Sequence, residues 1–169
     1  FCASKCSYCA FYSHAPGEGL ADRYVNALCR EMEFIAGDCT LKTIFFGGGT
    51  PSILNLNQWQ QILEAMRKHG LTGATEWSVE CNPATVSKDK AKLLREAGVN
   101  RISMGVQTFD ADLLERIGRI HTREQIYKSM EILRAAGIDN INLDLMFAIP
   151  TQTIVQWKSS LAEAVALSP

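Results

Sequence analysis

Short β-rich runs alternate with amphipathic helical stretches along the whole chain. The predicted strands cover 42–46, 76–81, 101–107 and 140–147, and the predicted helices cover 20–36, 57–68, 87–98, 112–117, 122–137 and 153–167. Alternation of this kind predicts parallel βαβ units with right-handed crossovers. The fold class is therefore α/β, as an open doubly wound sheet or as part of a (β/α) barrel.

Unusual polar residues fall at the carboxyl ends of these strands. The glycine run 47–49, Glu80, Gln107 and Asp144 each stand at or near such an end. The cysteines at the start of the chain would follow one more strand, upstream of Phe1. Because ligands bind at this edge of parallel sheets and barrels, we expect these residues to converge on one site.

Cys2, Cys6 and Cys9 form a C-x3-C-x2-C triplet. Three thiolates can hold an iron–sulfur cluster and leave one iron open to a small molecule, whereas a fourth cysteine would close it. A zinc site with His14 as fourth ligand is the alternative. Six cysteines in 169 residues are too sparse for a disulfide scaffold. The remaining three, Cys29, Cys39 and Cys81, are ordinary thiols suited to a reducing cytoplasm.

The other motifs each have a functional and a structural interpretation. Gly48, Gly49 and Thr50 could approach a ligand closely or form a flexible loop, and the Gly-Lys-Ser/Thr of a P-loop is absent. Glu80, Gln107 and Asp144 could bind hydroxyls or an ammonium of a ligand, or they could be solvent-exposed polar residues at the ends of strands. Arg119 could pair with a carboxylate or lie on the surface. His121 could be a general acid or base or a plain loop residue, and the loop is favoured.

Helical periodicity and capping residues predict local packing. In the first helix the inward residues would be Tyr24, Leu28, Met32 and Ile35, and in the second Trp59, Ile62, Leu63 and Met66. Trp157 and Leu161 would point inward from the last helix. Asn57 is the expected cap of the second helix, and Thr122 opens a capping box with Gln125.

Composition narrows the class of protein. With a net charge of −1, nothing indicates a nucleic-acid partner or an anionic membrane surface. No apolar run approaches the about 20 residues of a transmembrane segment, and no signal peptide is present, so we expect a cytoplasmic protein. We expect residues 1–169 to be the N-terminal portion of a barrel domain, lacking at least one upstream strand and the C-terminal domain.

The motifs together resemble the radical S-adenosylmethionine superfamily, and within it the group of oxygen-independent coproporphyrinogen III oxidases and related heme chaperones. The resemblance covers the chain from end to end. The stretches that carry it are 1–11, 45–52, 80–83, 100–107, 118–121 and 142–150.

The resemblance implies a partial (β/α) barrel and specific residue roles. Cys2, Cys6 and Cys9 would ligate a [4Fe–4S] cluster whose open iron chelates the amino and carboxylate groups of S-adenosylmethionine. The amino group of S-adenosylmethionine would meet Gly48 and its neighbours Gly49 and Thr50, and its carboxylate would pair with Arg119. Its ribose and amino-acid portion would be held by Glu80, Gln107 and Asp144. Its adenine would be flanked by Tyr8 and Phe11. An electron from a reducing donor would cleave the sulfonium, giving methionine and a 5′-deoxyadenosyl radical.

One position separates the two branches of this group. The oxidases have a further cysteine two residues after the third ligand, where this chain has Phe11. The resemblance therefore favours a heme chaperone that binds heme and delivers it to receiving proteins, whether or not it is also an enzyme. The alternative is oxidative decarboxylation of coproporphyrinogen III to protoporphyrinogen IX.

Overall fold

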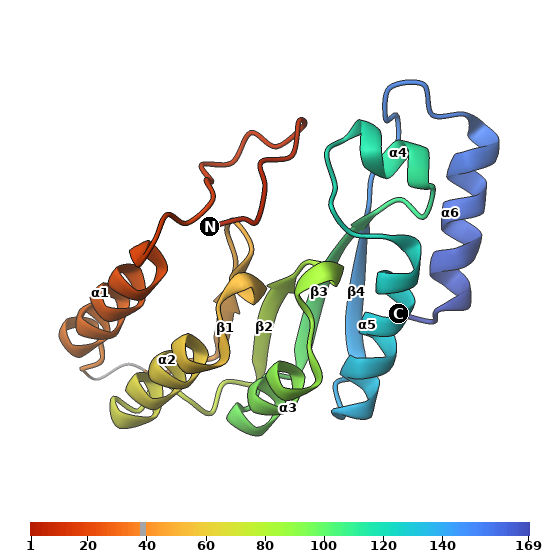
Figure 1. Cartoon of the computed structure of the whole chain (residues 1–169). Coiled ribbons are helices and arrows are strands. Elements are labelled where there is room, and N and C mark those ends of the chain that lie inside the picture. Colours follow the sequence, from red (N-terminus) through yellow and green to blue (C-terminus); the bar gives the residue numbers. More distant parts are fainter. Residues whose placement is uncertain (38–39) are drawn as a thin grey trace.

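The computed structural model describes residues 1–37 and 40–169, in which four strands form one parallel sheet (Figure 1). The strands are β1 (Thr43–Phe46), β2 (Glu76–Cys81), β3 (Arg101–Gln107) and β4 (Asn140–Leu145). Their spatial order, β1-β2-β3-β4, follows the chain without reversal. A doubly wound sheet would reverse its strand order, so the structure confirms the partial barrel.

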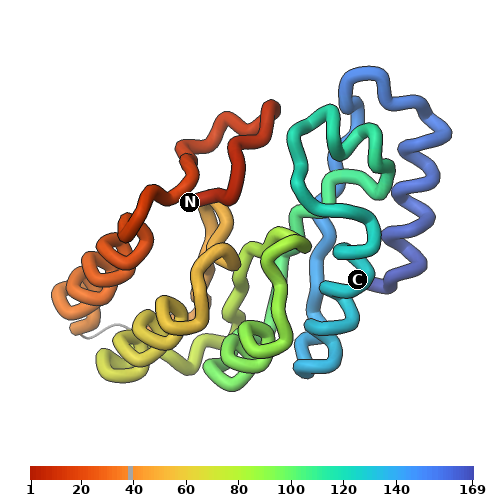
Figure 2. Tube along the Cα trace, in the orientation of Figure 1, coloured from red at the N-terminus to blue at the C-terminus, as the bar shows by residue number. Residues whose placement is uncertain are grey.

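Six helices accompany the sheet. They are α1 (Leu20–Ile35), α2 (Leu56–Lys68), α3 (Lys88–Ala97), α4 (Ala111–Arg116), α5 (Arg123–Ala135) and α6 (Ile154–Ala166), with 3-10 turns η1 (Pro51–Ile53) and η2 (Pro83–Thr85). The trace in Figure 2 shows α2, α3 and α5 in a row along one side of the sheet, with α1 beside α2. The cysteine loop and α4 lie at the edge where the strands end. No helix of the described residues is long and apolar enough to cross a membrane.

Side-chain alternation in β3 explains the two faces of the sheet. Ile102, Met104 and Val106 are fully buried on the helix side. The residues between them, such as Arg101 and Ser103, belong to the opposite face and are partly exposed. Because side chains alternate with a period of two along a strand, the helix-covered face is apolar and the other face is polar.

The core lies between the sheet and its helices. Trp59 and Trp77 are buried and flank Phe46, with ring centroids 5.2 and 6.2 Å from that of the phenylalanine. The predicted inward face of α2 is confirmed, since Trp59, Ile62, Leu63 and Met66 are all buried.

The predicted inward face of α1 is partly wrong. Tyr24 and Ile35 are 50% and 60% exposed, whereas Val25 and Met32 are buried. The main packing partner of α1 is α2. A helix that packs against one neighbour buries only a narrow stripe, and here that stripe is rotated from the one predicted.

The inward face of α6 is also different from the prediction. Leu161 is 39% exposed, while the small residues Ser160 and Ala164 are buried. The Ser160 hydroxyl lies 3.1 Å from the hydroxyl of Thr108 and accepts from the Phe109 backbone N–H. A polar group that satisfies buried donors at the end of β3 therefore takes the inward position.

The cap of α2 is Asn55, so the assignment to Asn57 is wrong. The Asn55 side chain accepts from the Gln58 N–H, and the Gln58 side chain accepts from the Asn55 N–H, both at 2.9 Å. This is a capping box, and it depends on the three-residue spacing to Gln58. The capping box predicted at Thr122 and Gln125 is confirmed. Cys39 lies outside the described residues.

We predict that Asn55→Ala lowers the free energy of unfolding by about 1 kcal/mol, because it removes one half of the capping box. Asn57→Ala, two residues further along α2, is the matched control and should change it by less than about 0.5 kcal/mol. Urea unfolding of the two variants tests this, and equal effects would contradict the assignment of the cap.

Candidate functional site

The cysteine loop is fixed to the carboxyl edge of the sheet at two points (Figure 1). Thr50 donates its backbone N–H to the Phe1 carbonyl at 2.6 Å and its hydroxyl to the Cys2 sulfur at 3.4 Å. At the other end, Ser7 donates its N–H to the Ile117 carbonyl at 3.3 Å. The loop therefore bridges the turn after β1 and the end of α4.

A cavity of about 510 Å³ opens between this loop and the strand ends. All twelve site residues predicted from the sequence line it: Cys2, Cys6, Tyr8, Cys9, Phe11, Gly48, Gly49, Thr50, Glu80, Gln107, Arg119 and Asp144. The structure thus brings together residues that the sequence places on six different segments. What they bind stays a prediction at this point.

The glycine run is tightly held, which argues against the flexible-loop interpretation. Gly48 and Gly49 have φ of 77° and 58°, in the left-handed region that glycine adopts without cost. Gly48 donates its N–H to Glu80 Oε2 at 3.0 Å. A Cβ at Gly49 would lie 2.6 Å from the Phe1 nitrogen and oxygen, so only glycine lets the two segments meet.

The turns after β1 and β2 are joined by a buried polar cluster. Ser52 Oγ lies 2.5 Å from Thr85 Oγ1 and accepts from the Asn82 N–H at 3.1 Å. Lys90 donates to the Ser52 carbonyl at 2.5 Å, and burial lowers the pKa of its ammonium. These contacts fix the segment that carries Glu80.

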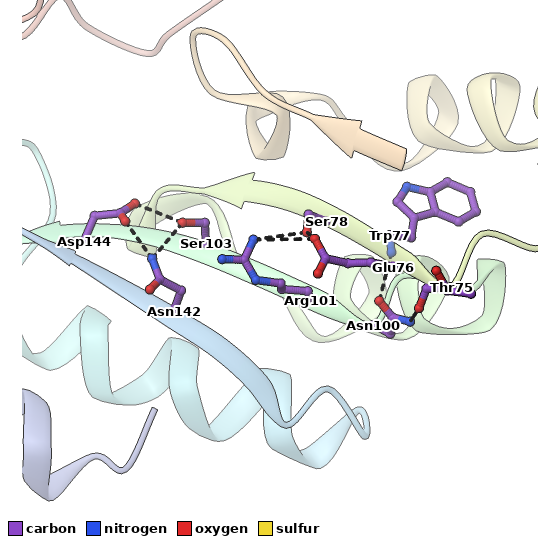
Figure 3. Close-up of polar contacts among 9 residues, drawn as sticks. All are labelled: Thr75, Glu76, Trp77, Ser78, Asn100, Arg101, Ser103, Asn142 and Asp144. Atoms are coloured by element: carbon purple, nitrogen blue, oxygen red, sulfur yellow. Dashed lines mark hydrogen bonds and ion pairs between the residues drawn. The ribbon is translucent and has the colours of Figure 1, made fainter. Parts of the chain in front are cut away.

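Asp144 is held by two neighbours that the sequence analysis missed. Ser103 donates to Asp144 Oδ2 at 3.0 Å, and Asn142 donates to Oδ1 at 2.7 Å (Figure 3). Asn142 also donates to the Ser103 hydroxyl at 3.1 Å. The contact between Asn142 and Asp144 could have been predicted from the sequence, because residues two apart on a strand share one face. The pairing of Ser103 required the register of β3 with β4.

An irregularity at the end of β3 sets the backbone conformation of Gln107. The register between β3 and β4 shifts between Gly105 and Gln107, and Gln107 has a φ of 67°. A Cβ at Gly105 would lie 3.0 Å from Gln107 Nε2 and 3.4 Å from Arg119 Nη2. The absence of a side chain at Gly105 therefore lets both groups approach the strand.

Arg119 is half-buried in the cavity wall, so it does not lie free on the surface. Its Nη2 donates to the Gly105 carbonyl at 2.5 Å and its Nη1 to the Cys6 sulfur at 3.7 Å. Among residues 1–37 and 40–169 it forms no ion pair with a carboxylate. Its positive charge is therefore open to an anion that enters the cavity.

His121 lies in the loop between α4 and α5, as predicted, but it is buried there and contacts Arg119. Its side chain is 3% exposed, its Nδ1 accepts from Arg119 Nε at 3.3 Å, and its Nε2 lies 3.1 Å from the Val106 carbonyl. Burial and the neighbouring Arg119 lower the pKa of His121 to about 4. The imidazole is therefore neutral at physiological pH.

The predicted metal ligands are the three cysteines of the loop, Cys2, Cys6 and Cys9. All three are free thiols beside the cavity, and Cys2 and Cys6 accept hydrogen bonds from Thr50 and Arg119. Within the described residues no three Cys, His, Asp or Glu side chains are grouped so that they could hold a metal ion. Binding of a cluster or of zinc by these cysteines therefore stays a prediction.

The charges in the cavity suit a zwitterionic ligand. Glu80 and Asp144 supply negative charge, and Arg119 supplies positive charge on the same wall. An α-amino acid carries an ammonium and a carboxylate that match both signs. Tyr8 and Phe11, 39% and 77% exposed, add aromatic surface on which a base could stack.

Comparison with known proteins gives a consistent result. The model of the radical SAM superfamily matches residues 1–164. The heme chaperone HemW of Bacillus subtilis is 43% identical over 99% of this chain and 45% of its own length. HemW of Escherichia coli is 38% identical, over 100% of this chain and 46% of its own. An oxygen-independent coproporphyrinogen III oxidase of Bradyrhizobium diazoefficiens is 33% identical, over 100% and 39%.

Solved structures show the same core. Coproporphyrinogen III oxidase (HemN) from Escherichia coli superposes with a TM-score of 0.90 at 28% identity, over 99% of this chain and 40% of that one. The methyltransferase TsrM from Kitasatospora setae, at 20% identity and a TM-score of 0.64 over 85% of this chain and 28% of that one, shares the fold alone. The chain spans less than half the length of the curated relatives it matches.

Cys81 should behave differently from the cysteines of the loop. It is 7% exposed, and burial raises its pKa to about 12, so at pH 9 it remains a protonated thiol. We expect iodoacetamide at pH 9 to modify Cys2, Cys6 and Cys9 of the folded, metal-free protein and to leave Cys81 intact, because the thiolate is the reactive form. Peptide mass mapping measures this, with urea-unfolded protein as the control in which Cys81 reacts. Modification of folded Cys81 as fast as Cys2 would contradict the prediction.

Proposed function

Because the chain belongs to the radical SAM superfamily, we propose that it is the cluster- and S-adenosylmethionine-binding part of a heme chaperone. The observation that carries the proposal is the single cavity that joins three free thiols to Arg119, Glu80 and Asp144. We also propose that residues 1–169 are the N-terminal portion of a longer barrel domain, which their coverage of the relatives supports.

The residues of this chain have distinct roles in the proposal. Cys2, Cys6 and Cys9 hold a [4Fe–4S] cluster, which when bound supplies the electron that cleaves the sulfonium of S-adenosylmethionine. Arg119 binds the carboxylate of that cofactor, and the edge formed by Gly48, Gly49 and Thr50 accommodates its amino group. Fixing both ends of the amino acid orients the sulfonium, so the protein contributes positioning.

The remaining residues bind the rest of the cofactor. Glu80 is fixed by the Gly48 N–H, and Asp144 is fixed by Ser103 and Asn142. Together with Gln107 these carboxylates accept hydrogen bonds from the ribose hydroxyls and the amino-acid portion. Tyr8 and Phe11 flank the adenine, and their rings exclude water from the cluster side of the cavity.

The chaperone function is preferred to the oxidase function for two reasons. The curated relatives named HemW reach 43% identity, whereas the relative named as an oxidase is 33% identical. Phe11 stands where an additional cysteine is expected in the oxidases, and its ring is 77% exposed at the cavity. The proposed partners are heme, a reducing electron donor and heme-receiving proteins in the cytoplasm.

We expect Cys6→Ala to abolish cluster assembly, because each of the three thiolates is needed. Iron and acid-labile sulfide would be measured in the anaerobically reconstituted full-length protein. Cys29→Ala is the matched control, since Cys29 lies on α1, where its thiol donates to the Gln61 carbonyl, so it should retain both elements. Retained iron and sulfide in Cys6→Ala would argue against the cluster site.

The chaperone and oxidase functions predict different outcomes with tetrapyrroles. The reconstituted full-length protein would be incubated with coproporphyrinogen III, S-adenosylmethionine and a reductant, and separately with heme. A chaperone is expected to bind heme in stoichiometric amount and to form no protoporphyrinogen. Turnover to protoporphyrinogen IX would exclude the chaperone assignment and support the oxidase.

A further inference from the structure

His121 contacts the Nε side of Arg119, and Arg119 but not His121 is among the residues that line the cavity. We infer that His121 is a positioning residue that sets the direction in which Arg119 presents its guanidinium to the carboxylate of S-adenosylmethionine. This inference rests on the proposed function, because it concerns the same carboxylate.

The contacts of His121 require one tautomer. The Val106 carbonyl, 3.1 Å from Nε2, can only accept a hydrogen bond, so Nε2 carries the proton. Arg119 Nε can only donate, so the facing Nδ1, at 3.3 Å, is the unprotonated nitrogen. A single neutral imidazole satisfies both partners, and the lowered pKa of this buried group agrees with that state.

The same contacts determine which part of Arg119 is available. His121 occupies the Nε–H, and the Gly105 carbonyl and the Cys6 sulfur each occupy one N–H of a terminal nitrogen. A guanidinium has five N–H groups, so one remains on each terminal nitrogen. An anion in the cavity therefore meets Arg119 through its terminal nitrogens, since the Nε–H already donates to His121.

A neutral acceptor is the group that this position requires. An aspartate or glutamate behind Arg119 would hold it in place, but it would also neutralise the charge and compete with the ligand carboxylate. A histidine in its neutral form fixes the direction of the guanidinium and leaves the positive charge available. Gly105 completes the arrangement, because a Cβ there would lie 3.4 Å from Arg119 Nη2.

Two amide substitutions separate the two contacts of His121. The amide oxygen of His121→Asn reaches the place of Nδ1 and keeps the acceptor for Arg119. The amide nitrogen of His121→Gln reaches the place of Nε2 and keeps the donor to Val106, but offers Arg119 no acceptor. Both side chains are polar and of similar size, so the pair is a matched test of which contact matters.

The experiment measures the dissociation constants of S-adenosylmethionine and of decarboxylated S-adenosylmethionine with reconstituted, full-length protein. We expect His121→Gln to weaken S-adenosylmethionine binding about tenfold, since hydrogen bonds to charged groups have energies of this order. Its effect on the decarboxylated compound should be less than about twofold. His121→Asn should resemble the wild type with both ligands. Iron content and urea unfolding verify that each variant is loaded and folded.

The outcomes distinguish the inference from the proposed function. In an Arg119→Ala background, His121→Gln should have no further effect, because His121 acts through Arg119. Equal weakening of both ligands, or an additive effect in that background, would overturn the positioning role. Unchanged S-adenosylmethionine binding in His121→Gln would overturn it as well. If the wild type binds no S-adenosylmethionine, the proposed function fails, and the inference with it.

Discussion

The alternation of side chains along parallel strands is the constraint on which the rest of this structure depends. In β3 every second residue is buried against the helices, which leaves Arg101, Ser103, Gly105 and Gln107 on the opposite face. The strands are parallel, and up to Gly105 their pairing is regular, so polar residues from β2, β3 and β4 lie side by side. A slip of one residue would turn these groups into the core, and the site would be lost together with the fold.

Within the described residues, the charged side chains of the cavity, Glu80, Asp144 and Arg119, form no ion pair with one another. Asp144 is held by a serine and an asparagine, Glu80 by a backbone N–H, and Arg119 by a neutral imidazole and a carbonyl. Glu80 and Asp144 are thus held by neutral partners, and Arg119 donates in addition to the Cys6 sulfur. Neutral partners fix direction at little cost to the field that a zwitterionic ligand would meet.

The sequence predicts the strands and the cavity residues well, because both depend on local patterns. The limits of β2 and β3 are confirmed to the residue, and β4 ends two residues earlier than expected. The twelve predicted site residues line one cavity, since the carboxyl ends of parallel strands must share one edge.

The errors concern contacts between distant segments. The inward stripe of α1 depends on how α2 packs against it, and the inward position of Ser160 depends on hydroxyl and amide groups fifty residues earlier in the chain. The role of His121 was not predictable, because its acceptor on Val106 lies fifteen residues away on β3. Periodicity within one segment carries no information on such pairs.

The close approach of Gly49 to Phe1 has a consequence for how this protein would respond to random mutation. The glycine has no side chain with which to bind a metal, yet a methyl group there would collide with the backbone next to Cys2. If the proposed cluster is bound, iron retention is therefore expected to be sensitive to Gly49, which lies nearly fifty residues from Cys2 in the chain. A mutational scan scored by metal content would rank this glycine with the cysteines themselves.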